Sequence, residues 1–293
     1  MRTLLFLATN IAIMVVLVIV AELLGIDQML AEQGMSMVGM LIPCALFGVG
    51  GSFLSLLISK WIAKRSTGCE IITEPRSDTE AWLIQTVGLQ AQAAGIGMPE
   101  VGIFPSQSPN AFATGANKNK ALVAVSAGLL HNMNKDEVEA VLAHEVSHVA
   151  NGDMVTLALI QGVLNTFVYF LARVIGQIVD GYLSRDGGRG GRGIGYFAVV
   201  IVAQIALGLL ASMIVMWFSR KREFKADAGG AALAGRPKMI AALERLKSAS
   251  DDVPLPEQLK AFGISGTPSR FMQLMASHPP IDERIERLHQ QAG

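Results

Sequence analysis

Cysteine and charge are both scarce in this chain of 293 residues. The two cysteines, Cys44 and Cys69, lie far apart and form no CxxC pair, so the sequence supports neither a disulfide framework nor a cysteine zinc site. Charged residues make up only 16% of the chain, against roughly 25% in an ordinary soluble domain. This deficit, beside an apolar fraction of 51%, is typical of a membrane protein.

Two further absences narrow the classes of ligand. Lysine and arginine together number 24, and so do aspartate and glutamate, so the chain has no bulk field that would attract nucleic acid. The phosphate-binding pattern GxxxxGK(S/T) does not occur, which argues against ATP binding within this chain. We therefore expect neither nucleic acid nor ATP among its partners.

Four apolar segments are long enough to cross a bilayer as helices, which takes roughly 20 residues each. They span residues 3–24, 37–59, 155–179 and 194–218. No clear cleavage site of small residues follows the first segment, so we interpret it as a membrane helix rather than a signal peptide. The sequence thus predicts an α-helical membrane protein with about four transmembrane helices.

The remaining sequence is polar and falls into two stretches, residues 60–154 and 220–293. Neither contains a spanning segment, and we expect them to form one domain that is split by a membrane hairpin at 155–219. This hairpin would hold the third and fourth helices and a glycine-rich loop at 180–193. Residues 1–59 would form the first two helices.

Basic residues flank the apolar segments unequally. Three of them lie within residues 60–65 and four within 220–225, whereas residues 25–36 carry two acidic residues and no basic one. The positive-inside rule then places both termini and the split domain in the cytoplasm. Three arginines at 185–192 would lie outside. Arginines on the outside run against the positive-inside rule. A shallow hairpin that does not cross the membrane would avoid this, and the sequence allows either a shallow hairpin or two full spans.

The first polar stretch has a mixed α and β pattern. Residues 79–94 show helical spacing, and residues 101–104 and 122–126 are short apolar runs of the kind that form strands. Residues 110–115 lie between the two runs and are interpreted as a short strand or strand-turn.

The helix with the strongest local signals starts after Asn134, a good N-cap residue, with Glu137 three positions later as in a capping box. It carries His144-Glu145-Val146-Ser147-His148, and we expect it to end at Gly152. Histidines at i and i+4 lie on one face of a helix, so both imidazoles can bind a single tetrahedral ion. Glu145 projects beside that ion, where a carboxylate can take a proton from the attacking water and return it to a leaving amine.

Such a site needs a third protein ligand. Glu223 and Asp227 follow the fourth apolar segment and share one helical face. Glu223 would complete a site of two histidines and one glutamate, with one position left for water, and Asp227 would orient a ligand imidazole. Spacing alone equally allows a charged helix end at which both acids pair with neighbouring lysines and arginines.

This order of motifs, HExxH and then ExxxD after two membrane segments, resembles the HtpX-type membrane zinc metalloproteases, which are related to the CAAX prenyl-protein endopeptidases. The matching stretches are residues 144–153, 222–227, 110–115 and 277–280. The four apolar segments agree in order, so the resemblance covers essentially the whole chain. It implies a mixed α/β, mainly helical, gluzincin-like metalloprotease domain.

The resemblance also implies a role for each matching residue. His144, His148 and Glu223 would bind one Zn²⁺ per chain. Glu145 would be the catalytic base, and Asp227 would orient the imidazole of one ligand. His278 would either stabilise the oxyanion of the tetrahedral intermediate or serve as a structural histidine at a proline-rich turn. An edge strand that pairs with the substrate backbone would comprise Asn110, Ala111, Phe112, Ala113, Thr114 and Gly115.

The sequence and the resemblance together predict a multi-pass zinc endopeptidase of the bacterial inner membrane, with its active site on the cytoplasmic side. The resemblance adds a role in quality control, with damaged membrane proteins or unfolded polypeptides as substrates and the lipid bilayer as a partner. A prenyl-protein processing protease is the nearest alternative, although four spans are too few for a large enclosed chamber. A non-catalytic zinc-binding scaffold would have no need of Glu145. A transporter would be expected to carry charges inside more of its segments.

Overall fold

The computed structural model describes residues 36–183, 194–251 and 276–290, together with residues 18, 19, 22, 23, 25, 28, 30 and 31. Most of the first predicted segment, residues 3–24, and residues 184–193 of the predicted loop lie outside the described residues. Within the described part, the chain is mainly helical with one small mixed sheet, which confirms the predicted fold class.

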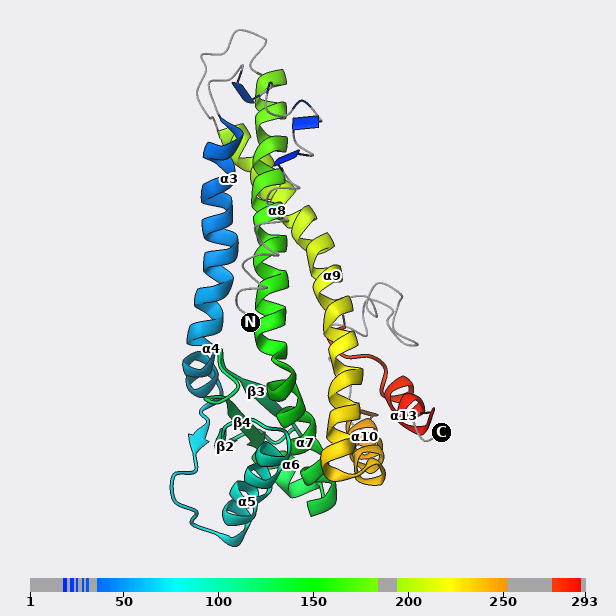
Figure 1. The fold of residues 1–293 in the computed structure, drawn as a ribbon. Coiled ribbons are helices and arrows are strands. Elements are labelled where there is room, and N and C mark those ends of the chain that lie inside the picture. Colours follow the sequence, from blue (N-terminus) through cyan, green and yellow to red (C-terminus); the bar gives the residue numbers. More distant parts are fainter. Residues whose placement is uncertain are drawn as a thin grey trace. The chain divides into compact units, whose positions relative to one another are not determined.

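Among the described residues, three helices are long and apolar enough to cross a membrane (Figure 1). They contain the second, third and fourth predicted segments. The first of them is built from α3 (Met37–Ala45), the π-helical turn η1 (Leu46–Gly50) and α4 (Gly51–Thr67). The other two are α8 (Asp153–Leu183) and α9 (Ile194–Ala234).

The fourth predicted segment ends at 218, but α9 continues without a break to Ala234. Arginine, lysine and glutamate at residues 220–225 favour helix, and no proline interrupts them. Glu223 and Asp227 therefore lie on the continuation of a membrane helix rather than on a separate one. One continuous helix thus carries both acids.

The chain divides into two compact units. One comprises Met1–Ser55 and Leu157–Val215, and the other comprises Leu56–Thr156 and Met216–Gly293. In the first unit, Gly48 lies so close to α8 that a Cβ there would stand 2.6 Å from the backbone nitrogen of Thr166. Only glycine permits this approach, so Gly48 serves helix packing.

The second unit contains a four-stranded sheet with the order β1-β2-β4-β3. Its strands are β1 (Glu70–Ile71), β2 (Glu100–Phe104), β3 (Ala111–Thr114) and β4 (Leu122–Ser126). β2 and β4 are parallel and the other pairs are antiparallel. Every residue of β4 is buried, which explains its continuous apolar run. Within the described residues, β3 pairs with β4 alone and forms an edge of the sheet.

Among the described residues, five helices lie entirely within the second unit. They are α5 (Asp78–Ala93), α6 (Ala127–Asn132), α7 (Lys135–Asn151), α10 (Arg236–Asp251) and α13 (Ile281–Gln290). α7 contacts both the sheet and α10 and thus lies at the centre of this unit (Figure 1). Its buried apolar residues between Val138 and Val149 contribute to one apolar core with α5, β4 and α10.

The ends of α7 form as predicted. The Asn134 side chain accepts a hydrogen bond from the backbone nitrogen of Glu137 at 3.0 Å, and the Glu137 carboxylate accepts one from the backbone nitrogen of Asn134 at 2.8 Å. Gly152 ends the helix with a φ of 71°, a conformation that favours glycine. α8 begins at the next residue, so the chain turns sharply beside His148.

Candidate active site

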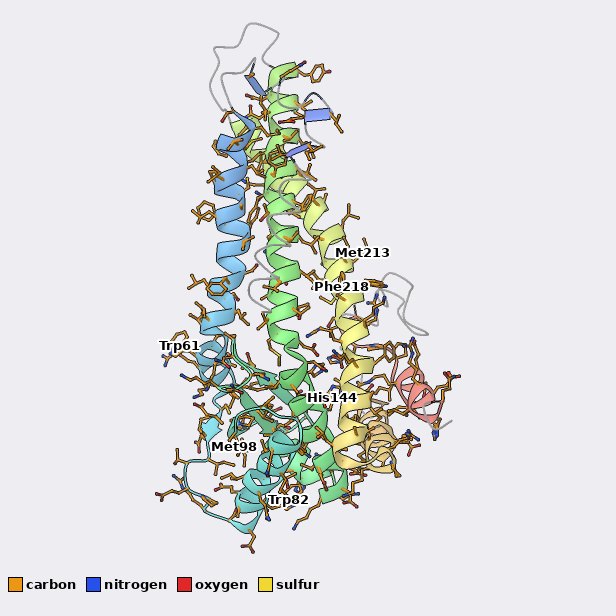
Figure 2. The ribbon with its side chains drawn as sticks, in the orientation of Figure 1. Trp61, Trp82, Met98, His144, Met213 and Phe218 are labelled. Atoms are coloured by element: carbon orange, nitrogen blue, oxygen red, sulfur yellow. The ribbon has the colours of Figure 1, made fainter. Side chains whose placement is uncertain are left out.

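Three side chains from two helices converge on one point of the second unit. His144 and His148 lie one turn apart on α7, and Glu223 reaches them from α9; Figure 2 labels His144. The Nε2 atoms of the two histidines are 3.1 Å apart. The Glu223 carboxylate oxygens lie 3.5 Å from Nε2 of His144 and 3.3 Å from Nε2 of His148. All three residues are buried, and the spacing of their ligand atoms would suit one metal ion.

These separations fit a tetrahedral ion. Zinc binds histidine nitrogen and carboxylate oxygen at roughly 2.0–2.2 Å, which places neighbouring tetrahedral ligand atoms roughly 3.3–3.6 Å apart. The observed separations of 3.1, 3.3 and 3.5 Å lie at or near this range. Of the two arrangements that the sequence allowed for Glu223, the structure contains the one in which it joins the two histidines.

A carboxylate stands behind each histidine. Oδ1 of Asp227 lies 3.0 Å from Nδ1 of His144, and Oδ2 of Asp153 lies 2.7 Å from Nδ1 of His148. The Asp153 carboxylate accepts the proton of Nδ1 of His148 and leaves the lone pair of Nε2 directed at the common centre, and the Asp227 carboxylate lies close enough to Nδ1 of His144 to favour the same orientation of that ring. The structure brings Asp227 to His144, and it adds Asp153, which sequence reasoning missed. Its contact depends on the left-handed turn at Gly152, which brings the residue after the helix back toward His148.

Arg284, from α13, is a second residue that sequence reasoning missed. Its Nε and Nη2 donate to the two carboxylate oxygens of Asp227 at 2.8 and 2.6 Å, in the bidentate geometry of a strong charge-assisted pair. Burial disfavours the charged guanidinium, but the Asp227 carboxylate outweighs it and keeps the pKa of Arg284 above its usual range. Arg284 and Asp227 are 57 positions apart, so no local pattern pointed to the pair.

The electrostatics of the centre favour positive charge. Burial by itself would lower the pKa of His148, but hydrogen bonds to Asp153 and Glu223 outweigh it and raise that pKa to about 10. At His144, burial is likewise outweighed by Asp227 and Glu223, and the pKa is raised. The acidic groups around the two rings therefore create a place suited to a cation.

A cavity of about 150 Å³ opens beside this centre. Glu145 and His144 line it, and so do Asn110 and Ala111 at the start of β3. His278 also lines it, with Nδ1 2.7 Å from Oε2 of Glu223 and a side chain that is 62% exposed. The cavity thus joins the candidate base, the candidate metal centre and the start of the edge strand.

The rest of the predicted edge segment does not line this cavity. The Phe112 ring packs against that of Phe104, with centroids 5.3 Å apart. The hydroxyl of Thr114 donates to that of Ser59 at 3.0 Å. These side chains attach β3 to the rest of the second unit, so any contact of this part of the strand with a substrate would involve its main chain.

Comparison with known proteins gives agreement along the whole chain. Protease HtpX of Stenotrophomonas maltophilia (strain R551-3) is 60% identical over 98% of this chain and 97% of its own length. Protease HtpX of Xanthomonas axonopodis pv. citri (strain 306) is 58% identical over 100% of this chain and 98% of its own length. These matches confirm the resemblance to HtpX-type proteases.

The fold is also similar to a solved structure. The crystal structure of S. mikatae Ste24p aligns with a TM-score of 0.57 over 97% of this chain and 67% of that one, at 17% sequence identity, which supports the fold alone. The profile of peptidase family M48 matches residues 77–292. Because the profile covers most of the chain and the HtpX relatives match it from end to end, this chain belongs to peptidase family M48 and is a membrane protease.

Proposed function

We propose that this protein is a zinc-dependent endopeptidase that cleaves damaged or misassembled membrane proteins and unfolded polypeptides. The observation that carries this proposal is the convergence of His144, His148 and Glu223 beside Glu145, in a cavity that reaches the edge strand β3. The buried donor atoms match the separations of a tetrahedral zinc site, and Glu145 is the carboxylate next to them. A purely structural metal site would have no use for that carboxylate or for an open cavity.

Each residue of the site has its own role in the proposed reaction. One Zn²⁺ held by the three ligands would supply Lewis-acid polarisation of the scissile carbonyl and of the attacking water. Glu145 takes a proton from that water and returns it to the nitrogen of the leaving amine. Asp227 and Asp153 hold the rings of His144 and His148. His278 lines the same cavity and is the proposed hydrogen-bond donor to the developing oxyanion.

The substrate class follows from what β3 offers. An edge strand recognises main-chain N–H and C=O groups and makes few demands on side chains. Folded proteins have already paired those groups, whereas a damaged or misassembled protein exposes them. The apolar helices place the site in a membrane protein, which favours membrane proteins and polypeptides at the bilayer surface as substrates. These considerations support a role in protein quality control.

Metal removal is the direct test of zinc dependence. We expect the purified protein to contain about one zinc per chain, to lose cleavage of an unfolded polypeptide after chelation, and to regain it when Zn²⁺ is added.

Glu223→Ala should have lower zinc occupancy under mild chelation, because one of three protein ligands is lost. Asp227→Ala is the matched comparison and should be milder, with a loss of roughly 10–100-fold in affinity or activity. Full zinc occupancy in Glu223→Ala would show that another residue is the third ligand.

We further propose that the protein resides in the inner membrane and that the active site faces the cytoplasm, because basic residues concentrate at 60–65 and 220–225. In a variant that lacks Cys44 and Cys69, a single cysteine near Asp27 should react with an impermeant thiol reagent in whole cells. A cysteine placed near Arg76 or Lys238 should react only after the cells are permeabilised. The reverse pattern of labelling would invert the orientation.

A further inference from the structure

The connection between β3 and β4, residues 115–121, is tied to α4 at both of its ends. The hydroxyl of Thr114, the last residue of β3, donates to that of Ser59 on α4 at 3.0 Å. The Nζ atom of Lys60, the next residue on α4, donates to the carbonyl of Lys120 at 3.1 Å. The whole connection is therefore held against one turn of α4, and all of these residues belong to the second unit.

This turn of α4 marks the edge of the bilayer. The apolar segment ends at Ser59, and Lys60 is the first charged residue after it. Leu57 is 54% exposed and Trp61 is 65% exposed, and Trp61 points away from the protein in Figure 2. Tryptophan is enriched where a membrane meets water. The connection between β3 and β4 thus lies at the level of the lipid headgroups.

The start of α8 lies on another side of the same connection. A hollow of about 20 Å³ is lined by Gly115 and Lys118 of the connection and by Met154 and Val155 of α8. Its volume allows little more than a water molecule, so a larger anion would have to bind on the exposed face of the connection. Two membrane helices, α4 and α8, therefore fix the position of this segment.

The tip of the connection is an ordered turn of residues 117–120, which we call the lysine turn. The backbone nitrogen of Lys120 donates to the carbonyl of Asn117, and that of Asn119 donates to Oδ1 of Asn117, both at 2.9 Å. Oδ1 of Asn119 accepts from the backbone nitrogen of Gly97 at 2.9 Å. A Cβ at Gly97 would stand 2.9 Å from the backbone of Asn119, so glycine permits this contact. The turn is thus organised before a ligand binds, which lowers the entropic cost of binding.

The lysine turn and its surroundings carry an excess of positive charge. Lys118 and Lys120 are exposed, and neither forms an ion pair with any residue that the structure describes. Beside them, Lys60 and Lys64 share the single carboxylate of Glu100, at 2.8 and 2.5 Å. Two lysines on one carboxylate leave one further positive charge uncompensated. This surface is therefore complementary to an anion at the headgroup level.

We propose that the lysine turn binds the phosphate groups of anionic phospholipids at the membrane surface. Lys118 and Lys120 supply the ammonium donors, and α4 and α8 hold them at the depth where lipid phosphates lie. A basic residue beside an anionic leaflet contributes roughly fivefold to binding. Because the turn directly follows β3, a bound lipid also holds the edge strand at the membrane surface. The proposal requires a membrane protein but does not depend on the proposed zinc chemistry.

Hydrogen–deuterium exchange of the full chain in lipid nanodiscs tests this site. The amides of Asn119 and Lys120 are hydrogen-bonded within the turn, so they exchange when the turn opens. A lipid that binds only the closed turn slows this exchange by mass action. In discs with roughly equal parts of phosphatidylglycerol and phosphatidylcholine, residues 115–121 should exchange at least about fivefold more slowly than in discs of phosphatidylcholine alone.

Two pairs of substitutions identify the groups that bind. Lys118→Gln combined with Lys120→Gln should remove the difference between the two kinds of disc, whereas Lys118→Arg combined with Lys120→Arg should retain it. Every one of these variants keeps the carbonyl that accepts from Lys60. Arg76→Gln combined with Lys135→Gln is the matched control, because it removes the same charge from exposed positions outside α4 and the lysine turn. This control should behave as the wild type.

Three outcomes would overturn the proposal. The first is equal exchange of residues 115–121 in both kinds of disc. The second is equal protection by soluble glycerol phosphate added to phosphatidylcholine discs, because the site would then bind a small anion rather than a lipid headgroup. The third is protection that persists when Lys118 and Lys120 are both replaced by glutamine, because the lipid would then be bound by other residues.

Discussion

Glu145→Gln should bind zinc normally and lose peptidase activity by roughly 10²–10⁴-fold, the usual contribution of a positioned general base. The amide keeps the size of the carboxylate but cannot accept a proton from the attacking water. The three proposed ligands, His144, His148 and Glu223, remain in place. The measurement is the rate at which purified protein cleaves a model membrane substrate, with zinc content determined on the same sample.

A matched glutamate controls for changes in the charge of α7. Glu139 lies on the same helix, forms an ion pair with Lys238 and does not line the cavity. Glu139→Gln should retain activity, because a partly exposed ion pair contributes little to stability. Near-normal turnover by Glu145→Gln, with zinc present, would show that Glu145 is not the base.

Proline at Ala111 or Ala113 should lower cleavage by at least about tenfold while zinc content persists, because it removes a main-chain donor and its ring obstructs the edge. The structure supplies the reason for these two positions. The backbone nitrogen of Ser126 donates to the carbonyl of Asn110 at 2.8 Å, so this opposed pair is hydrogen-bonded. Bonded and non-bonded pairs alternate along an antiparallel ladder. The main-chain groups of Ala111 and Ala113 therefore point away from β4, to the open edge.

The hydrogen bonds between β4 and β2, on the other side of β4, show the same alternation. The carbonyl of Ala121 accepts from the backbone nitrogen of Glu100, at the β2 side. Odd-numbered residues of β4 thus face β2 and even-numbered residues face β3, as the register of Phe112 with Ala124 requires. Strand alternation alone allows either Phe112 or both alanines to face the open edge. The ladder now selects the alanines as the positions exposed to a substrate.

The variants separate main-chain capture from simple loss of fold. Phe112→Pro should disrupt pairing with β4 and destabilise the protein, because Phe112 N–H faces that strand. Ala113→Ser leaves the backbone donor in place and should be tolerated. Thermal unfolding and zinc content are measured beside the cleavage rate. Normal cleavage by both alanine-to-proline variants, or a loss of cleavage that only accompanies loss of zinc, would remove support for capture at the edge.

Local sequence determined the helix that carries the chemistry. The capping box of Asn134 and Glu137, the glycine at 152 and the spacing of His144 and His148 all depend on residues within a few turns of one another. Steric and hydrogen-bonding rules acting over such distances do not depend on the remainder of the fold. The same holds for β4 and for the three apolar helices, whose composition alone identifies them.

Other features depend on residues that are distant in sequence. Spacing on α9 could not choose between a metal ligand and a surface ion pair for Glu223, because that choice depends on which helix packs against it. Arg284 joins Asp227 across 57 positions, and Asp153 meets His148 only through the turn at Gly152. A charge on the surface and a charge in a buried network have the same local sequence, and only packing distinguishes them.

The division between sequence and tertiary structure has one physical origin. The sequence by itself determined that two histidines share a helical face beside Glu145 and that long apolar helices accompany them, because backbone geometry fixes neighbours within a helix. Only the tertiary structure decided that Glu223 completes the centre, that Ala111 and Ala113 face the open edge, and that an apolar cavity adjoins Glu145. Each of these depends on how separate elements pack and pair, which no local pattern specifies.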